Sequence, residues 1–256
     1  MKFSNSVVLV TGANRGYGRA IAREFLNRLD EKSLLLLHSR SGAVPWLQEA
    51  NDSEKSRCKI EILKGDLSES IKWKELFDAK VSDSSFENAF LISNAGTCGN
   101  IEKPLLESGH MLDEMASFWT SNVAQFIPLA SVFKKKFSKS KIHIINITSL
   151  ISKVNVPKLS LYSASRRARN CLLEVIASED ASLRCLNWAP GPMETEMFYY
   201  MKETMIKTNT DVEMWQNMQP VKTDVSAKVF VDILAKDEYK SGEYIDLFDV
   251  WKQEEQ

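Results

Sequence analysis

The amino-acid sequence predicts an α/β fold in which one parallel sheet of about seven strands carries helices on both faces. Short runs rich in Val, Ile and Leu recur along the chain with helix-length segments between them, and this alternation is typical of βαβ units around a buried parallel sheet. The 256 residues suit a single domain of this class, and no internal repeat or Pro/Gly-rich linker marks a second one. We therefore expect one domain over residues 1–256.

Seven hydrophobic runs are expected to form the strands of this sheet. They span residues 6–12, 34–40, 59–67, 89–96, 141–149, 183–191 and 242–249. Ligands of open α/β sheets bind outside the carboxyl ends of the strands, so the polar and glycine-rich residues that end most of these runs are expected to line one site.

Two segments between the predicted strands have an unusual composition. The polar stretch 51–59 is expected to be a solvated loop. Residues 194–220 mix Met and aromatic side chains with charged ones, which favours a substrate lid over about residues 192–225. A pair of ordinary helices with Met and Trp in the core is an equally open alternative for this segment.

The charge balance argues against several classes of partner. The chain has 33 basic and 34 acidic residues and a formal net charge of -1, so no long-range field favours nucleic acid or an anionic membrane surface. The four cysteines form no CxxC pair and have no histidine at ligand spacing, which predicts neither a metal site nor disulfides. The hydrophobic run near the N-terminus is too short for a signal peptide or a membrane span, so we expect a cytoplasmic protein.

A glycine-rich turn, "TGANRGYGRAIA" (residues 11–22), follows the first predicted strand and leads into an apolar-periodic helix. Gly12, Gly16 and Gly18 let the chain turn tightly and bring backbone N–H groups and a helix N-terminus close to a pyrophosphate. Strand, turn and helix in this order predict a dinucleotide-binding, Rossmann-like doubly wound sheet.

Two arginines bear on the choice of dinucleotide. Arg15 lies in the glycine-rich turn and Arg40 at the end of the second strand, where the adenosine ribose would lie. Arginine pairs well with a 2'-phosphate, and the Asp or Glu expected at this strand end for NAD is missing, so we favour NADP over NAD. Two surface arginines without a ligand are the alternative.

Polar residues at the ends of later strands add walls to the same cleft. Asp66 could accept a hydrogen bond from the adenine amino group, and the backbone of residues 94–96 could approach the cofactor closely. Ser149 ends the fifth strand, and Tyr162 begins a predicted helix thirteen residues later. A carbonyl that is reduced by hydride develops negative charge on oxygen, and Ser149 and Tyr162 could supply the orienting donor and the proton donor.

Together these motifs resemble the short-chain dehydrogenase/reductase family from about residue 5 to the C-terminus. The resemblance implies an NADP(H)-dependent oxidoreductase acting on carbonyl or alcohol groups, with Ser149 and Tyr162 as catalytic residues and Asn122 holding the active-site helix. Ser93 stands where the family more usually has Asn, a departure we expect to matter little. The resemblance and the cleft described above place these residues at the cofactor: Gly12, Asn14, Arg15, Gly16, Tyr17, Gly18, Arg40, Asp66, Leu67, Asn94, Ala95, Gly96, Pro190, Gly191, Met193 and Thr195.

Arg166 stands where the resemblance implies a lysine that holds the nicotinamide ribose and favours the ionised form of the tyrosine. Tyr162 and Arg166 are four residues apart and share a helix face, and a unit charge about 4 Å away at an effective dielectric near 20 is worth roughly 4 kcal/mol. The electrostatic role can therefore persist. The guanidinium is bulkier than an ammonium and does not release its proton, which predicts a slower enzyme or an inactive one. Arg167 or Arg169 could share the role of Arg166, although both are expected on other faces of the helix.

Within this family the tail "KDEYKSGEYIDLFD" (236–249) resembles that of sepiapterin reductases, as do the stretches "GANRGYGRAIA" (12–22) and "LRCLNWAPGPMETEM" (183–197). The resemblance implies NADPH-dependent reduction of a pterin side-chain carbonyl, as in tetrahydrobiopterin synthesis. It also implies that Asp246 grips the pterin ring, which suits a carboxylate because it can accept two parallel hydrogen bonds from an aminopyrimidinone. By the same resemblance we expect a homodimer through helices that begin near Met111 and Tyr162.

Two other functions stay open on the sequence. The chain could reduce a ketone that is not a pterin, in which case Asp246 is a surface acid at a strand end. It could also be a catalytically silent NADP-binding protein with a regulatory or assembly role, which Arg166 alone supports. The presence of Asn122, Ser149 and Tyr162 favours an enzyme.

Overall fold

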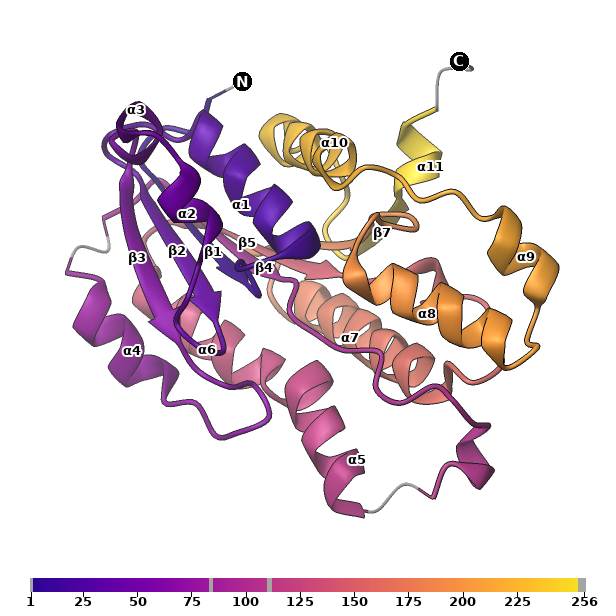
Figure 1. Cartoon of the computed structure of the whole chain (residues 1–256). Coiled ribbons are helices and arrows are strands. Elements are labelled where there is room, and N and C mark those ends of the chain that lie inside the picture. Colours follow the sequence, from indigo (N-terminus) through magenta and orange to yellow (C-terminus); the bar gives the residue numbers. More distant parts are fainter. Residues whose placement is uncertain (1, 83–84, 110–111, 253–256) are drawn as a thin grey trace.

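A computed structural model of the chain describes residues 2–82, 85–109 and 112–252. A parallel sheet of seven strands in the order β3-β2-β1-β4-β5-β6-β7 runs through this part of the molecule (Figure 1). The strands are β1 (Ser6–Thr11), β2 (Leu34–Ser39), β3 (Lys59–Lys64), β4 (Asn88–Ser93), β5 (Lys141–Ile147), β6 (Arg184–Ala189) and β7 (Glu243–Asp246). The predicted α/β fold and its seven strands are confirmed. The strands end one to three residues earlier than predicted, because loops follow the first six of them and the helix α11 follows β7.

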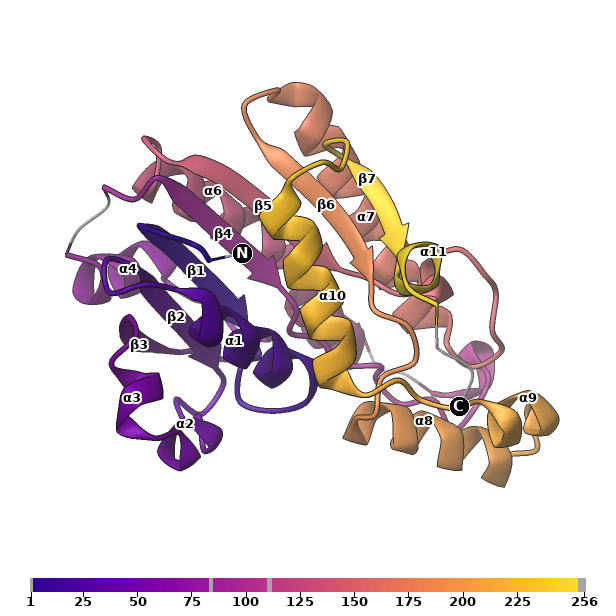
Figure 2. The same ribbon diagram turned by 90° about the horizontal axis from the view of Figure 1, so that it is seen from above.

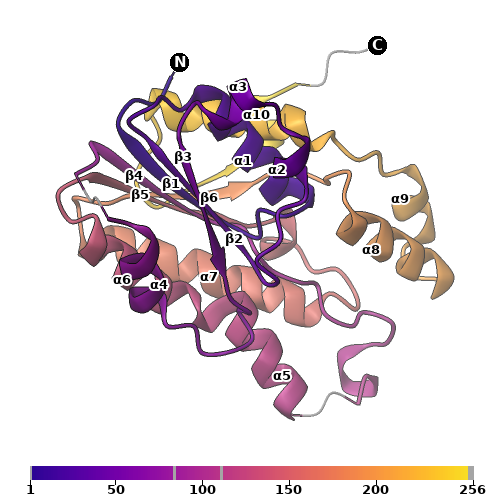
Figure 3. The same ribbon diagram turned by 60° about the vertical axis from the view of Figure 1, so that its left-hand side comes forward.

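Helices form a layer on each face of the sheet, which the turned view in Figure 3 shows. One layer holds α1 (Gly16–Arg28), α2 (Trp46–Glu49), α3 (Asp52–Lys55) and α10 (Thr223–Lys236). The opposite layer holds α4 (Trp73–Lys80), α5 (Leu112–Trp119), α6 (Phe126–Lys136) and α7 (Ser160–Glu179). No helix in the described residues is both long and apolar enough to cross a membrane.

The remaining elements gather near the carboxyl ends of the strands. Figure 2 shows α8 and α9 beyond the ends of β6 and β7. These elements are the helices α8 (Glu196–Lys207), α9 (Val212–Asn217) and α11 (Leu247–Val250) and the short turns η1 (Leu105–Glu107), η2 (Thr120–Ala124) and η3 (Leu150–Ser152). The carboxyl edge is therefore the edge on which a site can be built from many segments.

The inner strands are buried on both faces, while the edge strands β3 and β7 are partly exposed. Alternate side chains of an inner strand therefore belong to opposite layers. In β1, Val8 and Val10 join the hydrophobic cluster that includes side chains of α1 and α10. Val7 and Leu9 join the cluster formed with α4 and α6. All four side chains are fully buried, which explains why the strands read as continuous hydrophobic runs in the sequence.

The expectation of a simple loop over residues 51–59 is wrong at its centre, where α3 forms. Asn51 accepts a hydrogen bond from the backbone N–H of Glu54, and the Glu54 side chain accepts one from the backbone N–H of Asn51, both at 2.9 Å. This reciprocal capping satisfies two backbone donors that a short helix otherwise leaves open. No residue of α3 is buried, so the helix is solvated as the segment was predicted to be.

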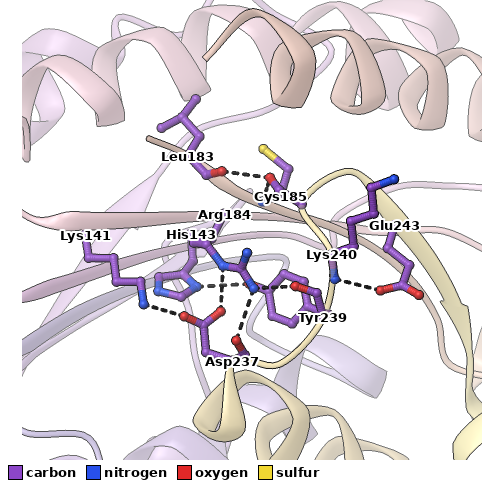
Figure 4. A network of polar contacts seen from close by, with 10 residues as sticks. Lys141, His143, Leu183, Arg184, Cys185, Asp237, Tyr239, Lys240 and Glu243 are labelled. Carbon is purple, nitrogen blue, oxygen red and sulfur yellow. Dashed lines mark hydrogen bonds and ion pairs between the residues drawn. The ribbon is translucent and has the colours of Figure 1, made fainter. Parts of the chain in front are cut away.

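A polar network at the amino ends of β5 and β6 fixes the turn that leads into β7 (Figure 4). Asp237, which follows α10 with φ of 52°, accepts a hydrogen bond from Nε of Arg184 at 2.7 Å. The buried ring of His143 is hydrogen-bonded through Nδ1 to the Tyr239 hydroxyl at 3.0 Å. These contacts tie the turn to the sheet and so help to set the register of β7, which carries Asp246 at its far end.

Phe133 is expected to be a sensitive position in the layer of α4 and α6. Its ring is fully buried, and its centroid lies 6.2 Å from that of Phe77 and 4.8 Å from that of Phe137. Phe133→Ala removes this packing and leaves a cavity, so it should lower the free energy of unfolding by about 3–5 kcal/mol, measured by urea titration. The matched variant Val175→Ala, at a half-exposed position of α7, should lower it by less than about 1 kcal/mol. Equal losses would contradict this view of the core.

Candidate active site

The cleft begins where the neighbouring strands β1 and β4 end. The hydroxyl of Thr11, the last residue of β1, accepts hydrogen bonds from the backbone N–H groups of Asn94 at 2.9 Å and Ala95 at 3.0 Å. The Asn94 side-chain amide donates in return to the Thr11 carbonyl at 2.9 Å. The chain leaves β1 toward one helix layer and β4 toward the other, and such a switch point is where open α/β sheets bind ligands.

The glycine-rich turn between β1 and α1 forms a backbone cradle. Gly12 and Gly16 have φ of 67° and 55°, a left-handed conformation that favours glycine. A Cβ on Gly18 would lie 2.2 Å from the Gly12 carbonyl oxygen, so only glycine fits there. α1 begins without a side-chain cap and without an acidic residue in its first turn. Its uncapped N–H groups and positive dipole end therefore suit a diphosphate.

Gly96 brings the backbone against two polar side chains from other elements. A Cβ at this position would lie 2.6 Å from Nη2 of Arg166 and 2.8 Å from Oδ1 of Asn122. Asn122 is buried in the π-helical turn η2, and its Oδ1 accepts a hydrogen bond from the backbone N–H of Thr97 at 3.0 Å. The structure thus brings Asn122 and Arg166 together behind the wall formed by residues 94–96.

Ser149 and Tyr162 lie on two segments that are fastened to each other. Ser149 follows β5 and caps η3, since its hydroxyl accepts from the backbone N–H of Ile151 at 3.2 Å. Tyr162 lies in the first turn of α7, and the hydroxyl of the adjacent Ser163 donates to the Ile151 carbonyl at 2.8 Å. This contact holds the start of α7 against the segment that carries Ser149.

Arg166 is buried on the face of α7 that carries Tyr162. Its guanidinium lies over the Tyr162 ring, with 4.8 Å between Cζ and the ring centroid, and Nη1 donates to the Ile147 carbonyl of β5 at 3.1 Å. A cation over the face of a tyrosine ring is attracted by the ring quadrupole. The arginine therefore lies beside the tyrosine as their spacing predicts, but one of its donors is engaged by the sheet.

The expectation that Arg169 lies on another face of this helix is wrong. Seven residues make about two helical turns, so Arg169 returns to the face of Tyr162, where 1% of its surface is exposed. Arg167 is exposed, as expected, and donates to Oδ1 of Asn155 at 2.7 Å. Arg169 is a buried cation that sequence reasoning missed. The spacing of i, i+4 and i+7 from Tyr162 is the signal that identifies it.

Helices α8 and α9 pack over Tyr162. The tyrosine belongs to a buried cluster that includes Phe198 of α8 and Trp215 of α9. The two ends of the segment meet, because Met193 and Val221 form a parallel β-bridge. The segment is thus a pair of helices that bury Met and Trp side chains, as one of the two alternatives left open by its sequence expects.

Arg15 and Arg40, the arginines predicted near a 2'-phosphate, both have acidic partners. Arg15 forms an exposed ion pair with Glu196 at the start of α8. Nε of Arg40 lies 4.0 Å from Oδ2 of Asp66. The backbone N–H and the hydroxyl of Ser68 donate to Oδ1 of Asp66 and hold the pKa of this carboxyl below its usual value. One oxygen of Asp66 is thus already engaged, while the two arginines stay accessible to a ligand.

The side chain of Tyr17 points into the core, although this residue was predicted to bind the cofactor. Its hydroxyl accepts hydrogen bonds from Nε1 of Trp188 at 2.8 Å and from the Ser226 hydroxyl at 3.1 Å. Burial raises the pKa of this phenol. Any contact between Tyr17 and a cofactor therefore comes from its backbone.

The other predicted cofactor residues lie at or beside the carboxyl ends of the strands. Thr195 caps α8 by accepting from the backbone N–H of Phe198 at 3.3 Å, and its methyl carbon lies 3.4 Å from the position of a Cβ on Gly16. This contact brings the start of α8 up to the glycine-rich turn. The remaining residues of this group are Asn14 after β1, Leu67 after β3, and Pro190, Gly191 and Met193 after β6.

Asp246 ends β7 at the same edge of the sheet, in register with Ala189 of β6. Its Oδ1 accepts from the backbone N–H of Phe248 at 3.0 Å, and Asp249 accepts from the backbone N–H of Asp246 at 3.1 Å, so the two acids cap α11. Partial burial, together with the neighbouring Asp249 carboxylate, raises the pKa of Asp246. The Asp246 carboxylate thus already accepts hydrogen bonds from the backbone of α11.

Fold and site together define a class of protein. A glycine-rich turn at an uncapped helix, with a serine, a tyrosine, an asparagine and a buried cation near one edge of the sheet, is suited to a nicotinamide cofactor and to acid–base chemistry at an oxygen atom. The chain belongs to the short chain dehydrogenase family, whose sequence pattern matches residues 6–206. It is therefore an oxidoreductase of this family, and the resemblance predicted from its motifs is confirmed.

Several known proteins are similar to this chain over nearly its whole length. The sepiapterin reductase of Mus musculus is 29% identical over 258 residues, which cover 95% of this chain and 97% of that protein. The sepiapterin reductase of Xenopus tropicalis is 29% identical over 255 residues, which cover 94% of this chain and 95% of that protein. An angucycline C-6 ketoreductase, solved with bound NADP, has the same fold, with a TM-score of 0.74, 20% identity and coverage of 96% of this chain and 95% of that one.

Gly96 and Gly18 should respond differently to substitution by alanine. At Gly96 the new methyl group meets the flexible ends of Arg166 and Asn122, so Gly96→Ala should displace them and weaken nicotinamide cofactor binding about tenfold with little change in Tm. At Gly18 the methyl group meets the backbone of Gly12, so Gly18→Ala should lower both cofactor affinity and Tm. Quenching of tryptophan fluorescence and thermal melting measure the two effects. A large loss of Tm in Gly96→Ala would show that this glycine serves the fold rather than the site.

Proposed function

We propose that this protein is an NADPH-dependent reductase whose substrate is a pterin with a side-chain carbonyl, such as sepiapterin, in the synthesis of tetrahydrobiopterin. The observation that carries the proposal is the placement of Ser149, Tyr162 and Arg166 at the sheet edge that also carries Asp246. The similarity to sepiapterin reductases supports the choice of a pterin, because it covers nearly the whole chain.

The residues around the glycine-rich turn fit a dinucleotide. A Cβ on Gly18 would fill the cradle, and the first N–H groups of α1 have no side-chain cap. In our proposal Arg15 and Arg40 each exchange a carboxylate partner for the 2'-phosphate, with which arginine can form bidentate hydrogen bonds. Residues 94–96 and Arg166 line the nicotinamide end. When bound, the reduced nicotinamide supplies the hydride that a carbonyl carbon needs.

In this proposal three residues contribute to the acid–base chemistry: Ser149, Tyr162 and Arg166. The Ser149 hydroxyl donates to the substrate carbonyl oxygen and orients it, and Tyr162 gives its proton to the same oxygen as negative charge develops there. Arg166 lies over the ring of Tyr162 and stabilises the tyrosinate that remains. Its bond to the Ile147 carbonyl keeps the guanidinium in place.

Asn122 and the α8–α9 segment support this chemistry. Oδ1 of Asn122 holds the backbone of Thr97 and so keeps the wall of residues 94–96 in position. We propose that residues 192–225 act as the substrate lid, because Phe198 and Trp215 pack with Tyr162 and would exclude water from the reacting oxygen. Opening of the segment would then admit the substrate.

Each alternative function is favoured by one observation. Asp246 already caps α11. This structural role would be sufficient for Asp246 in a reductase whose substrate is a ketone other than a pterin. Arg166 already donates to the Ile147 carbonyl, as expected if the chain binds NADP without turning over. We nevertheless propose the pterin reductase, and with it a cytoplasmic homodimer. Of the two helix starts predicted for the dimer contact, Met111 lies outside the described residues.

Arg166 should limit the rate of this enzyme. With NADPH and sepiapterin, the wild type should turn over slowly, and Arg166→Lys should raise kcat about tenfold because the ammonium is smaller and its donors rotate freely. Oxidation of NADPH followed by absorbance measures both rates, and NADH should support less turnover than NADPH. Arg167→Lys is the matched control and should leave the rate unchanged. Activity in neither the wild type nor Arg166→Lys would overturn the pterin reductase proposal.

Asp246 should determine pterin affinity. Asn is as good a helix cap as Asp, so Asp246→Asn should keep α11 in place but lose the paired acceptor for the pterin, raising KM for sepiapterin more than about tenfold. KM for a simple aromatic ketone should not change. Because the pKa of Asp246 is raised, the carboxylate is lost at a higher pH than for an ordinary aspartate, so wild-type pterin affinity should fall as the pH drops toward that range. An unchanged KM for sepiapterin would favour the non-pterin alternative.

A further inference from the structure

Arg169 is a fully buried cation that the proposed reaction does not use. Its Nη2 donates to the carbonyl and to the hydroxyl of Ser93, the latter at 2.8 Å. Its Cζ lies 5.7 Å from the ring centroid of Phe126 in α6. Nε of Arg169 has no hydrogen-bond partner within the described residues. The side chain thus reaches from α7 across to the end of β4.

Arg166 and Arg169 lie one turn apart on the same helix, and both are buried. Within the described part of the chain, neither guanidinium pairs with a carboxylate. Burial, reinforced by the nearby Arg166 cation, holds the pKa of Arg169 well below its ordinary value. Two unpaired buried cations oppose folding, so the stability of the fold does not explain them. A buried charge of this kind beside a candidate site points to a role in that site.

Ser93 connects Arg169 to the cofactor wall. It is the last residue of β4 and comes directly before residues 94–96. Thr11 binds the first part of this wall from the side of β1, and Arg169 binds Ser93 from the side of α7. Where the family resemblance implies Asn, this chain has the smaller Ser93. Its backbone carbonyl and its hydroxyl both accept hydrogen bonds from the guanidinium of Arg169.

We infer that Arg169 is a positioning residue for the cofactor cleft. Through Ser93 it fixes the end of β4 and hence the wall of residues 94–96. Its charge repels the Arg166 guanidinium and so keeps that group against Tyr162 at the edge of the cleft. The inference rests on the proposed NADPH function, since the groups that Arg169 holds are those that would line the nicotinamide end. If Arg169 has this role, its charge and its hydrogen-bond donors are needed for ligand binding and not for folding.

The test compares NADPH binding with stability in the full chain. Arg169→Met keeps an unbranched, though shorter, side chain and removes its charge and donors, and Arg169→Lys keeps the charge. NADPH affinity is measured by tryptophan fluorescence and stability by the Tm without ligand. Arg169→Met should weaken NADPH binding about tenfold, and Arg169→Lys should restore it to within about threefold of the wild type. The Tm of Arg169→Met should be equal to or higher than that of the wild type, because an unpaired buried charge is removed.

The matched control is Arg167→Met, which changes an exposed arginine of the same helix and should bind NADPH like the wild type. Arg169→Met that binds NADPH normally would overturn the inference. The inference would also be overturned if Arg169→Met lost NADPH affinity and Tm together and Arg169→Lys restored neither, because a purely structural residue gives this pattern. A wild type that binds neither NADPH nor NADH would instead refute the proposed function from which the inference starts.

A double-mutant cycle tests the route through Ser93. Ser93→Ala alone should weaken NADPH binding, but it should have almost no further effect in the Arg169→Met background, because the contact is then already lost. Ser93→Asn, which introduces the residue usual in the family, should also weaken binding here, since the larger side chain meets the buried guanidinium. Independent losses from Ser93→Ala and Arg169→Met would show that Arg169 does not act through Ser93.

Discussion

The hydroxyl of Thr11 joins the two central strands at the place where the sheet opens, and the arrangement of the site depends on this junction. On one side the chain enters the glycine-rich turn and α1. On the other side Asn94 and Ala95 begin the wall that ends at Gly96. The loops that follow these two strands run to opposite faces of the sheet, so hydrogen bonds between the strand ends are needed to keep the gap at a fixed width. The Thr11 hydroxyl and the Asn94 side-chain amide provide them.

The two helix layers contribute different chemistry to this gap. The layer of α1 presents backbone N–H groups, which are dipoles without net charge. The layer of α7 presents buried guanidinium groups beside Tyr162. Positively charged groups that are fixed before a ligand binds need not rearrange when an oxygen atom gains negative charge. Such preorganised groups are usually the largest single contribution to the stabilisation of that charge in enzymes. Arg166 and Arg169 are both held by backbone carbonyls of the sheet, which suits them to the preorganised role that we propose.

Much of the fold could be predicted because its signals are local. The seven strands are continuous apolar runs, and the glycine-rich turn follows the first of them. The helix α3 was missed although its capping pair, Asn51 and Glu54, is visible in the sequence. Arg169 was assigned to another face although seven residues bring a helix back to the same side. The capping pair and the seven-residue spacing are both local patterns, so the sequence itself indicates α3 and the position of Arg169.

Other features depend on tertiary contacts and could not be predicted from a single sequence. The Tyr17 side chain turns into the core because Trp188 and Ser226, both far along the chain, offer it hydrogen bonds there. The capping of α11 by Asp246 depends on where β7 ends, which the network around Asp237 helps to fix. Asn122 lies in a π-helical turn against Gly96, and its Oδ1 accepts from the backbone of Thr97, which is distant from it along the chain.

The bridge between Met193 and Val221 has a consequence for how such a protein can change. Since the two ends of the α8–α9 segment already meet, the segment is a closed excursion from the sheet. Its start is tied to the glycine-rich turn, because Thr195 lies against Gly16 and Glu196 pairs with Arg15. The part after Glu196 has no such tie to this turn, so a graft of a related segment there would give Tyr162 a new covering and leave the junction of β1 and β4 as it is.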